Sequence, residues 1–265
     1  MAKRKENENI KFGPAGLGPV KDAVKNLEEY HKLGLKACEI AFTYSVYIKE
    51  EDAKTIGEAA KRLGIQLSIH APYFLNLNSE DPKKIESSKK RILDCLKIGT
   101  ILQAKYVIFH SGFYGKKGKE ETYENIKKNI LDLQELRKEK NYTPNLAPET
   151  MGKINVFGSI EEISRLVHDT KCSACIDFAH ILARSGGDYR FRETLNNFKD
   201  LKELHIHFSG IVYGEKGEKY HKKTPEEEWI KLLSNLPKNK NLVIVNESPD
   251  MIKDSAAGKR IYGSL

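Results

Sequence analysis

Short apolar runs alternate with longer amphipathic windows along most of the chain. This alternation predicts repeated strand–helix units and a parallel sheet. Strands are expected at residues 10–12, 37–41, 66–69, 106–109, 145–148, 173–176, 204–207 and 242–246. Helices are expected at about 22–33, 51–63, 82–102, 121–138, 159–168, 191–198 and 226–236. Eight strands and at least seven helices without an internal linker predict one (β/α)8 TIM barrel, a single α/β domain over residues 1–265.

Local signals mark several of the predicted boundaries. Gly34 and Gly64 stand where the first two helices should end. Ser159, with Glu162 three residues later, is the pattern of a capping box at a helix start. The long polar segment 208–225 is predicted as a loop, and its length suggests a function beyond connection.

Composition and charge restrict the class of protein. The chain has 265 residues, of which 39% are hydrophobic and 31% charged, as in an ordinary water-soluble domain. No apolar run approaches twenty residues, and the charged start lacks the apolar core of a secretory signal. We therefore expect a cytoplasmic protein without a membrane partner or an obligate protein partner, with residues 1–8 as a frayed tail.

The net charge of +8 permits a polyanionic partner, and nucleic acid is the first candidate. A lysine-rich proteome or the charged surface of a thermophile protein would give the same charge. The four cysteines are expected to be reduced in a cytosolic protein. Cys172-x-x-Cys175 has no second pair to complete a structural zinc site, so packing is the favoured role of Cys175.

Several predicted strands end in a residue that can bind a metal. These strand-end residues are His70, His110, Glu149, Asp177, His207 and Glu247, and His180 and His221 lie in predicted loops beside them. The carboxyl ends of barrel strands converge, so we expect these side chains in one cavity. Zinc usually takes four ligands, so eight candidates indicate two or three ions with a bridging carboxylate. Such clusters suit phosphate-ester hydrolysis.

Taken singly, these residues have simpler interpretations. His70 or His110 alone would more often be a hydrogen-bonded core histidine, and Glu149 could be a solvated loop acid. Six strands ending in ligand types would be an unusual coincidence, which favours the joint interpretation. His205 shares a strand face with His207. We take His207 as the ligand because it is nearer the mouth of the barrel.

Six short motifs surround these residues. They are His70-Ala71-Pro72-Tyr73, Phe109-His110-Ser111-Gly112, Glu149-Thr150, Cys175-Ile176-Asp177-Phe178-Ala179-His180, His207-Phe208-Ser209-Gly210 and Asn246-Glu247-Ser248. Together they resemble the motifs of the endonuclease IV family, which are apurinic/apyrimidinic (AP) endonucleases of the xylose isomerase-like TIM barrel superfamily. The resemblance extends from about Ile10 to Glu247.

The resemblance implies a trinuclear zinc site, although Mn²⁺ and Fe²⁺ accept the same ligands. One ion would be held by His70, His110 and Glu149, a second by Glu149, Asp177, His207 and Glu247, and a third by His180 and His221. The catalytic roles fall to Glu149 as the bridge and Glu247 as a group that orients the nucleophile. The family has an aspartate where this chain has Lys219, and the neighbouring Glu218 could replace it only if the loop shifts by one residue.

The resemblance also implies contacts with DNA. Tyr73 matches the family's DNA-contacting tyrosine, but the loop at 43–49 lacks the arginine that the family inserts. Tyr44 and Tyr47 could stack on exposed bases. The basic residues expected to contact phosphates are Lys116, Lys117, Lys119, Arg184, Lys222 and Lys223.

The resulting hypothesis is a metal-dependent AP endonuclease that acts in base-excision repair. It would hydrolyse the phosphodiester 5′ of an abasic site in double-stranded DNA. The rival is a sugar isomerase or epimerase on the same barrel, which would need one metal held by Glu149, Asp177, His207 and Glu247. A DNA-binding barrel that has lost catalysis is a third possibility.

Overall fold

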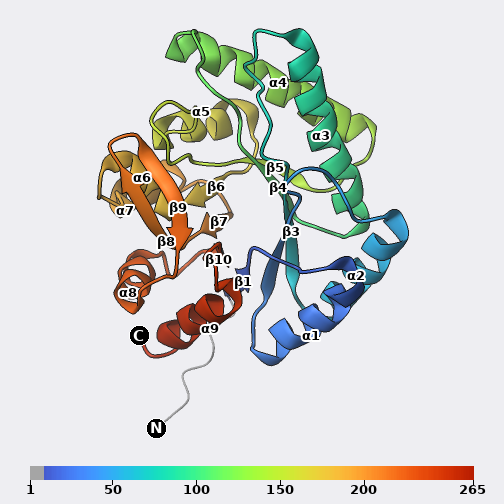
Figure 1. Cartoon of the computed structure of the whole chain (residues 1–265), viewed down its shortest axis with the longest axis vertical. Coiled ribbons are helices and arrows are strands. Elements are labelled where there is room, and N and C mark those ends of the chain that lie inside the picture. The colour runs from blue at the N-terminus through green and yellow to red at the C-terminus, as the bar shows by residue number, and fades with distance from the viewer. Residues whose placement is uncertain (1–8) are drawn as a thin grey trace.

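The computed structural model describes residues 9–265 and has a ring of parallel strands at its centre (Figure 1). The barrel strands are β1 (Ile10–Pro14), β2 (Ala37–Ala41), β3 (Gln66–His70), β4 (Tyr106–Phe109), β5 (Asn145–Pro148), β6 (Cys175–Asp177), β7 (Glu203–His207) and β10 (Asn241–Asn246). They form two four-stranded halves, in the order β2-β3-β4-β5 and β1-β10-β7-β6. The frayed tail predicted at residues 1–8 lies outside the described residues.

Two junctions join the halves into a closed barrel. Between β1 and β2, the backbone N–H of Lys36 donates to the carbonyl of Phe12 at 3.0 Å. A Cβ at Gly13 would lie 1.8 Å from the carbonyl oxygen of Ala37, so only glycine permits this close approach. Between β5 and β6, Glu149 forms a parallel bridge with Cys175. The predicted (β/α)8 barrel is confirmed.

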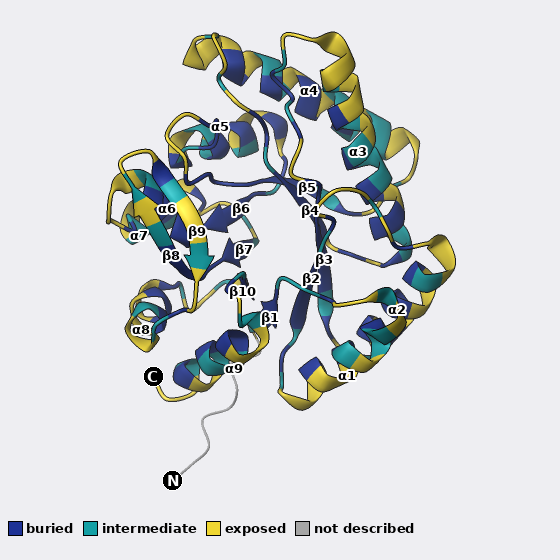
Figure 2. Ribbon diagram, in the orientation of Figure 1, coloured by how far each residue is buried: buried dark blue, intermediate teal, exposed yellow. Residues whose placement is uncertain are grey.

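Helices surround the strands, with their buried faces turned inward and their exposed faces toward solvent (Figure 2). They are η1 (Val20–Asp22), α1 (Ala23–Lys32), α2 (Glu50–Leu63), α3 (Pro82–Ile101), α4 (Lys119–Glu139), α5 (Ile160–Thr170), α6 (Phe178–Ser185), α7 (Phe191–Asn197), α8 (Glu226–Asn235) and α9 (Met251–Tyr262). Gly64 ends α2 at a left-handed φ of 65°, and Ser159 forms the predicted capping box with Glu162. No helix in residues 9–265 is long and apolar enough to cross a bilayer.

Two helices, α6 and α9, were not predicted from the sequence. Helix α6 begins directly after β6, and the carboxylate Oδ1 of Asp177 caps it by accepting the backbone N–H of His180 at 2.8 Å. The prediction that His180 lies in a loop is therefore wrong, because it occupies the first turn of a helix. This position fixes the direction of its side chain relative to Asp177.

The polar segment predicted as a loop contains a β-hairpin. Strand β8 (Gly210–Gly214) pairs antiparallel with β9 (Gly217–Lys222), and the hairpin packs on α6 (Figure 1). Val212 pairs with Tyr220 whereas Tyr213 pairs with Glu218, so Lys219 is the extra residue of a β-bulge. A bulge shifts the alternation of side chains by one position, which allows residues 218 and 221 to face the same side.

Candidate metal centre

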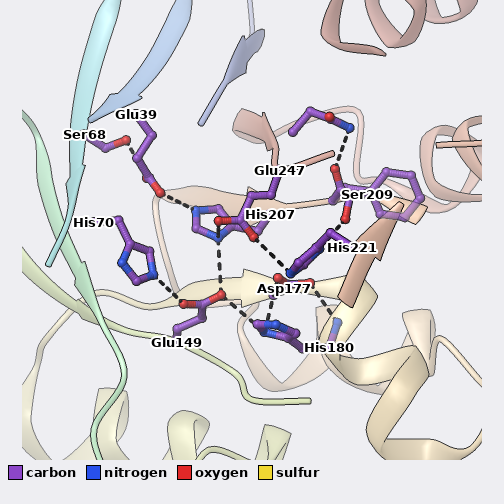
Figure 3. Close-up of polar contacts among 12 residues, drawn as sticks. Glu39, Ser68, His70, Glu149, Asp177, His180, His207, Ser209, His221 and Glu247 are labelled. Atoms are coloured by element: carbon purple, nitrogen blue, oxygen red, sulfur yellow. Dashed lines mark hydrogen bonds and ion pairs between the residues drawn. The ribbon is translucent and has the colours of Figure 1, made fainter. Parts of the chain in front are cut away.

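The predicted ligands meet at the carboxyl end of the barrel, and Figure 3 labels all of them except His110, which contacts Glu149. They come from β3 (His70), β6 (Asp177), α6 (His180), β7 (His207) and β9 (His221), and from the residues that follow β4 (His110), β5 (Glu149) and β10 (Glu247). Most of these side chains are buried, while those of His110, His221 and Glu247 are 16–22% exposed. The cluster is therefore enclosed by protein on most sides and accessible on the side of these three residues.

Glu149 lies at the middle of the cluster, and its two oxygens face different histidines. Oε2 is 3.1 Å from Nε2 of His70 and 3.1 Å from Nε2 of His110. Oε1 is 3.3 Å from Nδ1 of His180 and 3.3 Å from Nδ1 of His207. Nδ1 of His180 is also 3.0 Å from the carbonyl of Thr150, so Nε2 is the nitrogen of that ring left free for a metal. A carboxylate with histidines at each of its oxygens can bridge two cations.

Three adjoining groups of potential ligands can be distinguished, and within each the donor atoms lie within 4.8 Å of one another. The groups are His70–His110–Glu149, Glu149–Asp177–His207–Glu247 and Asp177–His180–His221. Glu149 and Asp177 each belong to two groups. The first two groups match the ligand sets that the family resemblance implied, and the third adds Asp177 to the predicted histidine pair.

The electrostatics of the cluster require positive charge among the carboxylates. Burial disfavours the charged form of Glu149, but His207 and its other histidine neighbours hold its pKa well below the usual range. Burial likewise opposes ionisation of Glu247, and His207 lowers its pKa to about 2. Burial raises the pKa of Asp177 to about 6 despite the nearby His180. Either imidazolium groups or divalent cations can supply the compensating charge.

The donor set fits divalent transition metals. Nitrogen and carboxylate oxygen ligands of this kind suit Zn²⁺, Mn²⁺ and Fe²⁺. The Oδ2 atom of Asp177 is buried without a hydrogen-bond partner, an unfavourable state that a bound cation would remedy. The residues present therefore meet the requirements of a metal centre.

Hydrogen bonds outside the cluster fix the orientation of its rings. Nδ1 of His70 is 2.9 Å from the carbonyl of Ala71, which leaves Nε2 facing Glu149. Nδ1 of His221 is 2.6 Å from Oγ of Ser209, which leaves Nε2 on the side of the cluster. Such bonds select the tautomer whose free nitrogen can bind a metal.

Glu218, which was not among the ligands predicted from the sequence, also faces the cluster. Its Oε2 is 3.3 Å from Nε2 of His180 and is buried without a hydrogen-bond partner. The bulge explains this placement, because it directs Glu218 and His221 toward α6 and leaves Lys219 exposed. Glu218 could replace the family's aspartate only if the loop shifted by one residue. The bulge at Lys219 provides this shift.

The placement of Glu218 predicts unequal effects of substituting two adjacent residues. Glu218→Gln should weaken binding of one ion at least about tenfold, because even outer-shell partners of ligands contribute 10–100-fold to metal affinity. Lys219→Ala should leave the metal content unchanged. Metal per chain, measured after dialysis at a fixed free metal concentration, tests the pair. Loss of metal in the lysine variant alone would show that Glu218 is not a ligand.

A second residue that the sequence analysis did not select, Glu39, lies deeper in the barrel. It stands in the middle of the apolar strand β2 and is fully buried. Burial disfavours its charge, but His207 and His205 hold its pKa well below the usual range. A carboxylate inside an apolar strand was the sequence signal for it, since such a group requires partners.

Of the tyrosines predicted to contact DNA, Tyr73 lies beside the cluster. Tyr73 is 53% exposed, and its ring centroid is 5.3 Å from that of His110. Tyr47 is 48% exposed and packs edge-on against Phe42. Tyr44 stacks on the equally exposed Phe74, with 6.4 Å between the ring centroids.

The basic side chains predicted to contact DNA phosphates differ in whether their charged groups are free or already bound within the protein. Lys116 and Lys222 are exposed. The amine of Lys117 is 3.4 Å from Oδ1 of Asn78. The Arg184 guanidinium was expected to face DNA, but Nη1 donates to the backbone carbonyls of Lys153 at 2.6 Å and Val156 at 2.9 Å. This arginine therefore holds the loop after β5, which no sequence pattern indicated.

Comparisons with known proteins agree with this architecture. The model of the xylose isomerase-like TIM barrel family matches residues 27–249. An uncharacterized protein of Methanocaldococcus jannaschii is 35% identical over 96% of this chain and 97% of its own length. A probable endonuclease 4 of Aquifex aeolicus is 27% identical over 63% of this chain and 64% of its own length.

Solved structures with the same fold include enzymes of two kinds. Endonuclease IV from Thermus thermophilus has a TM-score of 0.67 at 23% identity, over 97% of this chain and 98% of that one. A D-tagatose 3-epimerase-like protein has a TM-score of 0.74 at 20% identity, over 96% of each chain. At these identities the likeness shows the fold alone, so the side chains of the site must carry the functional argument.

Proposed function

The chain belongs to the xylose isomerase-like TIM barrel family, and on that premise we propose that it is a metal-dependent AP endonuclease of base-excision repair. It would hydrolyse the phosphodiester 5′ of an abasic site in double-stranded DNA. The products would be a 3′-hydroxyl and a 5′-deoxyribose phosphate. The cofactor would be two or three Zn²⁺ ions, or Mn²⁺ or Fe²⁺ in their place.

The observation that supports this proposal best is the size of the ligand cluster. One ion in the group of Glu149, Asp177, His207 and Glu247 would be enough for a sugar isomerase or epimerase. The cluster also places His70 and His110 at one oxygen of Glu149 and His180 near the other. A set of adjoining metal sites suits the displacement of one phosphate oxygen by another.

The side chains have separable roles in this reaction. Bound divalent ions would supply Lewis-acid stabilisation of the phosphate and lower the pKa of water. Glu149 would hold two ions through its two oxygens. Glu247 is 18% exposed at the cluster, and we assign it to orient the attacking water. His70, oriented by its contact with the carbonyl of Ala71, and His207, whose Nε2 lies 3.0 Å from Glu39, would help to hold the ions.

The surface around the centre suits a nucleic acid. The exposed rings of Tyr73 and Tyr47 offer faces on which bases can stack. Lys116, Lys117 and Lys222 add positive charge, in keeping with the net charge of +8. An abasic nucleotide has no base to unstack, so turning it toward the centre costs less than turning an intact one.

Substitution of Lys222 should change the salt dependence of DNA binding. Lys222→Ala removes an exposed cation from β9 and should lower the slope of log K against log salt by about 0.9 if one phosphate contact is lost. Lys231→Ala on the outer helix α8, where Lys231 pairs with Glu228 at 3.0 Å, is the matched control. Binding to a duplex with one abasic site would be titrated at several salt concentrations. Equal slopes for both variants would remove Lys222 from the DNA contact.

The sugar isomerase or epimerase remains the second candidate function. The observation in its favour is that Glu149, Asp177, His207 and Glu247 form a complete four-ligand group by themselves. This group could hold one ion with a sugar bound above it. A single ion per chain together with turnover of ketohexoses would favour it over the endonuclease.

One preparation can decide between the candidates. Metal per chain would be counted, and the protein would be incubated with a duplex that carries one abasic site. Two or three ions and a chelator-sensitive nick on the 5′ side support the endonuclease. One ion and intact DNA contradict it and call for sugar substrates. Tight binding of abasic DNA without a nick in metal-replete buffer would indicate a barrel that has lost catalysis.

A further inference from the structure

A buried polar network lies beneath the metal centre and connects β2, β3 and β7 (Figure 3). Its central residue is Glu39, whose Oε2 accepts a hydrogen bond from Oγ of Ser68 at 2.7 Å. The same oxygen is 3.0 Å from Nε2 of His205. The other oxygen, Oε1, forms an ion-pair contact of 3.0 Å with Nε2 of His207, although the two atoms do not meet the geometry of a hydrogen bond and have no other hydrogen-bond partner among the described residues. All four side chains are buried, so this carboxylate reaches the metal centre only through His207.

The two nitrogens of His207 face opposite groups. Nε2 is directed to Glu39, whereas Nδ1 is 3.3 Å from Oε1 of Glu149 and 3.5 Å from Oε1 of Glu247. A neutral imidazole carries only one N–H. If that hydrogen is on Nε2 beside Glu39, the lone pair of Nδ1 faces the centre and is available to a metal.

We propose that Glu39 is a positioning residue of the metal centre, which holds His207 in the tautomer and rotamer that present Nδ1 to a metal ion. This inference rests on the metal centre of the proposed function. It does not depend on whether the substrate is DNA or a sugar, because His207 belongs to the four-ligand group that both candidates share. Carboxylates that accept the second N–H of a ligating histidine commonly contribute 10–100-fold to metal affinity.

Ser68 and His205 hold Glu39 itself in place. The Nδ1 atom of His205 is buried without a partner, so Nε2, beside Glu39, is its hydrogen-bonding atom. The ring of His205 packs against that of Tyr106, with 5.3 Å between centroids. A buried carboxylate destabilises a fold unless it is partnered. Ser68 and His205 both contact Oε2, so Oε1 is left to face Nε2 of His207.

A different use of these side chains would be an interior metal site. Cys175, His205 and His207 can bring one donor atom each within 4.8 Å of the others. We favour the polar network around Glu39 because Nε2 of each histidine lies 3.0 Å from one of its oxygens, within ion-pair distance. The two arrangements differ in the number of ions bound, which makes them separable by experiment.

The test compares Glu39→Gln and Glu39→Met with Glu203→Gln. Glu203 is a matched control because its carboxylate also lies on a barrel strand, at the opposite end of β7, where it pairs with Lys105 at 2.8 Å and Gln66 at 2.9 Å. Each protein would be loaded with Co²⁺, whose visible absorption reports on its ligands, and then titrated with a chelator. The Glu39 variants should release one ion 10–100-fold more readily and with a changed Co²⁺ spectrum. The control should match the wild type.

Ser68→Ala is the milder variant, and it keeps the test decisive if the Glu39 variants do not fold. Loss of one hydrogen bond to Glu39 should weaken the same ion about fivefold, the equivalent of roughly 1 kcal/mol. A folded variant with wild-type affinity and an unchanged Co²⁺ spectrum would overturn the inference. So would an additional ion that is lost in Cys175→Ser.

These readouts separate this inference from the proposed function. Intact abasic DNA together with a Co²⁺ spectrum that depends on Glu39 would refute the endonuclease and support the positioning role. Nicked DNA together with Glu39 variants that behave as the wild type would support the endonuclease and refute the positioning role. A wild-type chain that binds no divalent ion would overturn both.

Discussion

Glu149→Gln is expected to lower cleavage of abasic DNA at least about a thousandfold and to reduce the bound metal. The carboxylate faces four histidines, two at each oxygen. The amide of glutamine presents an NH₂ group at one of these two positions and carries no negative charge. Lewis-acid stabilisation of several kcal/mol would then be lost, and about 4 kcal/mol corresponds to a thousandfold in rate.

Single-turnover cleavage of a labelled duplex and metal analysis of the same preparation would test this prediction. Glu215→Gln is a suitable control, because Glu215 is an exposed acid in the turn of the β8–β9 hairpin. It should cleave and bind metal as the wild type does. A Glu149→Gln variant with full activity would refute the bridging role, whatever its metal content.

Removal of the bound metal is expected to have the second large effect, on both cleavage and stability. Dialysis against a chelator should abolish cleavage and lower the melting temperature by roughly 10 °C. A ligand at a thousand times its dissociation constant stabilises a fold by about 4 kcal/mol, and each kcal/mol shifts the midpoint by about 2–4 °C at this chain length. The buried carboxylates Glu149, Asp177 and Glu247 would otherwise depend on imidazolium groups for compensation.

Addition of Zn²⁺, Mn²⁺ or Fe²⁺ to the stripped protein should restore both properties, and Ca²⁺ should not, since histidine nitrogens are poor ligands for it. Differential scanning calorimetry with each ion measures the stability, and the nicking assay measures the activity. An equal melting temperature with and without Zn²⁺ would show that no metal occupies the cluster.

The barrel and the position of its site followed from the sequence because each depends on local patterns. Alternating apolar runs predicted the eight barrel strands, although β6 is shorter than expected and starts at Cys175. The eight predicted ligands lie together because parallel strands of a barrel end at one face. Ligand-type residues directly after apolar runs were therefore sufficient to locate the cluster.

The parts of the site that were not predicted depend on three-dimensional contacts for which the sequence has no local pattern. A β-bulge at Lys219 cannot be recognised in a glycine- and lysine-rich segment, so Glu218 was considered only as a neighbour. Helix α6 is eight residues long and begins at a strand end, and its start therefore resembled a loop. Glu39 and His205 come from strands far apart in the chain, and only the closed barrel brings them within 3.0 Å.

The dispersal of the cluster along the chain restricts how this protein can fold. The predicted ligands extend from His70 on β3 to Glu247 after β10, and each comes from a different segment. The group of His70, His110 and Glu149 is complete within the first 149 residues, whereas the four-ligand group is complete only when Glu247 has been made. The chain must close the ring through contacts of high sequence separation, which makes folding slow. An ion in the four-ligand group, which joins the two halves of the barrel, would then act after closure, by slowing unfolding.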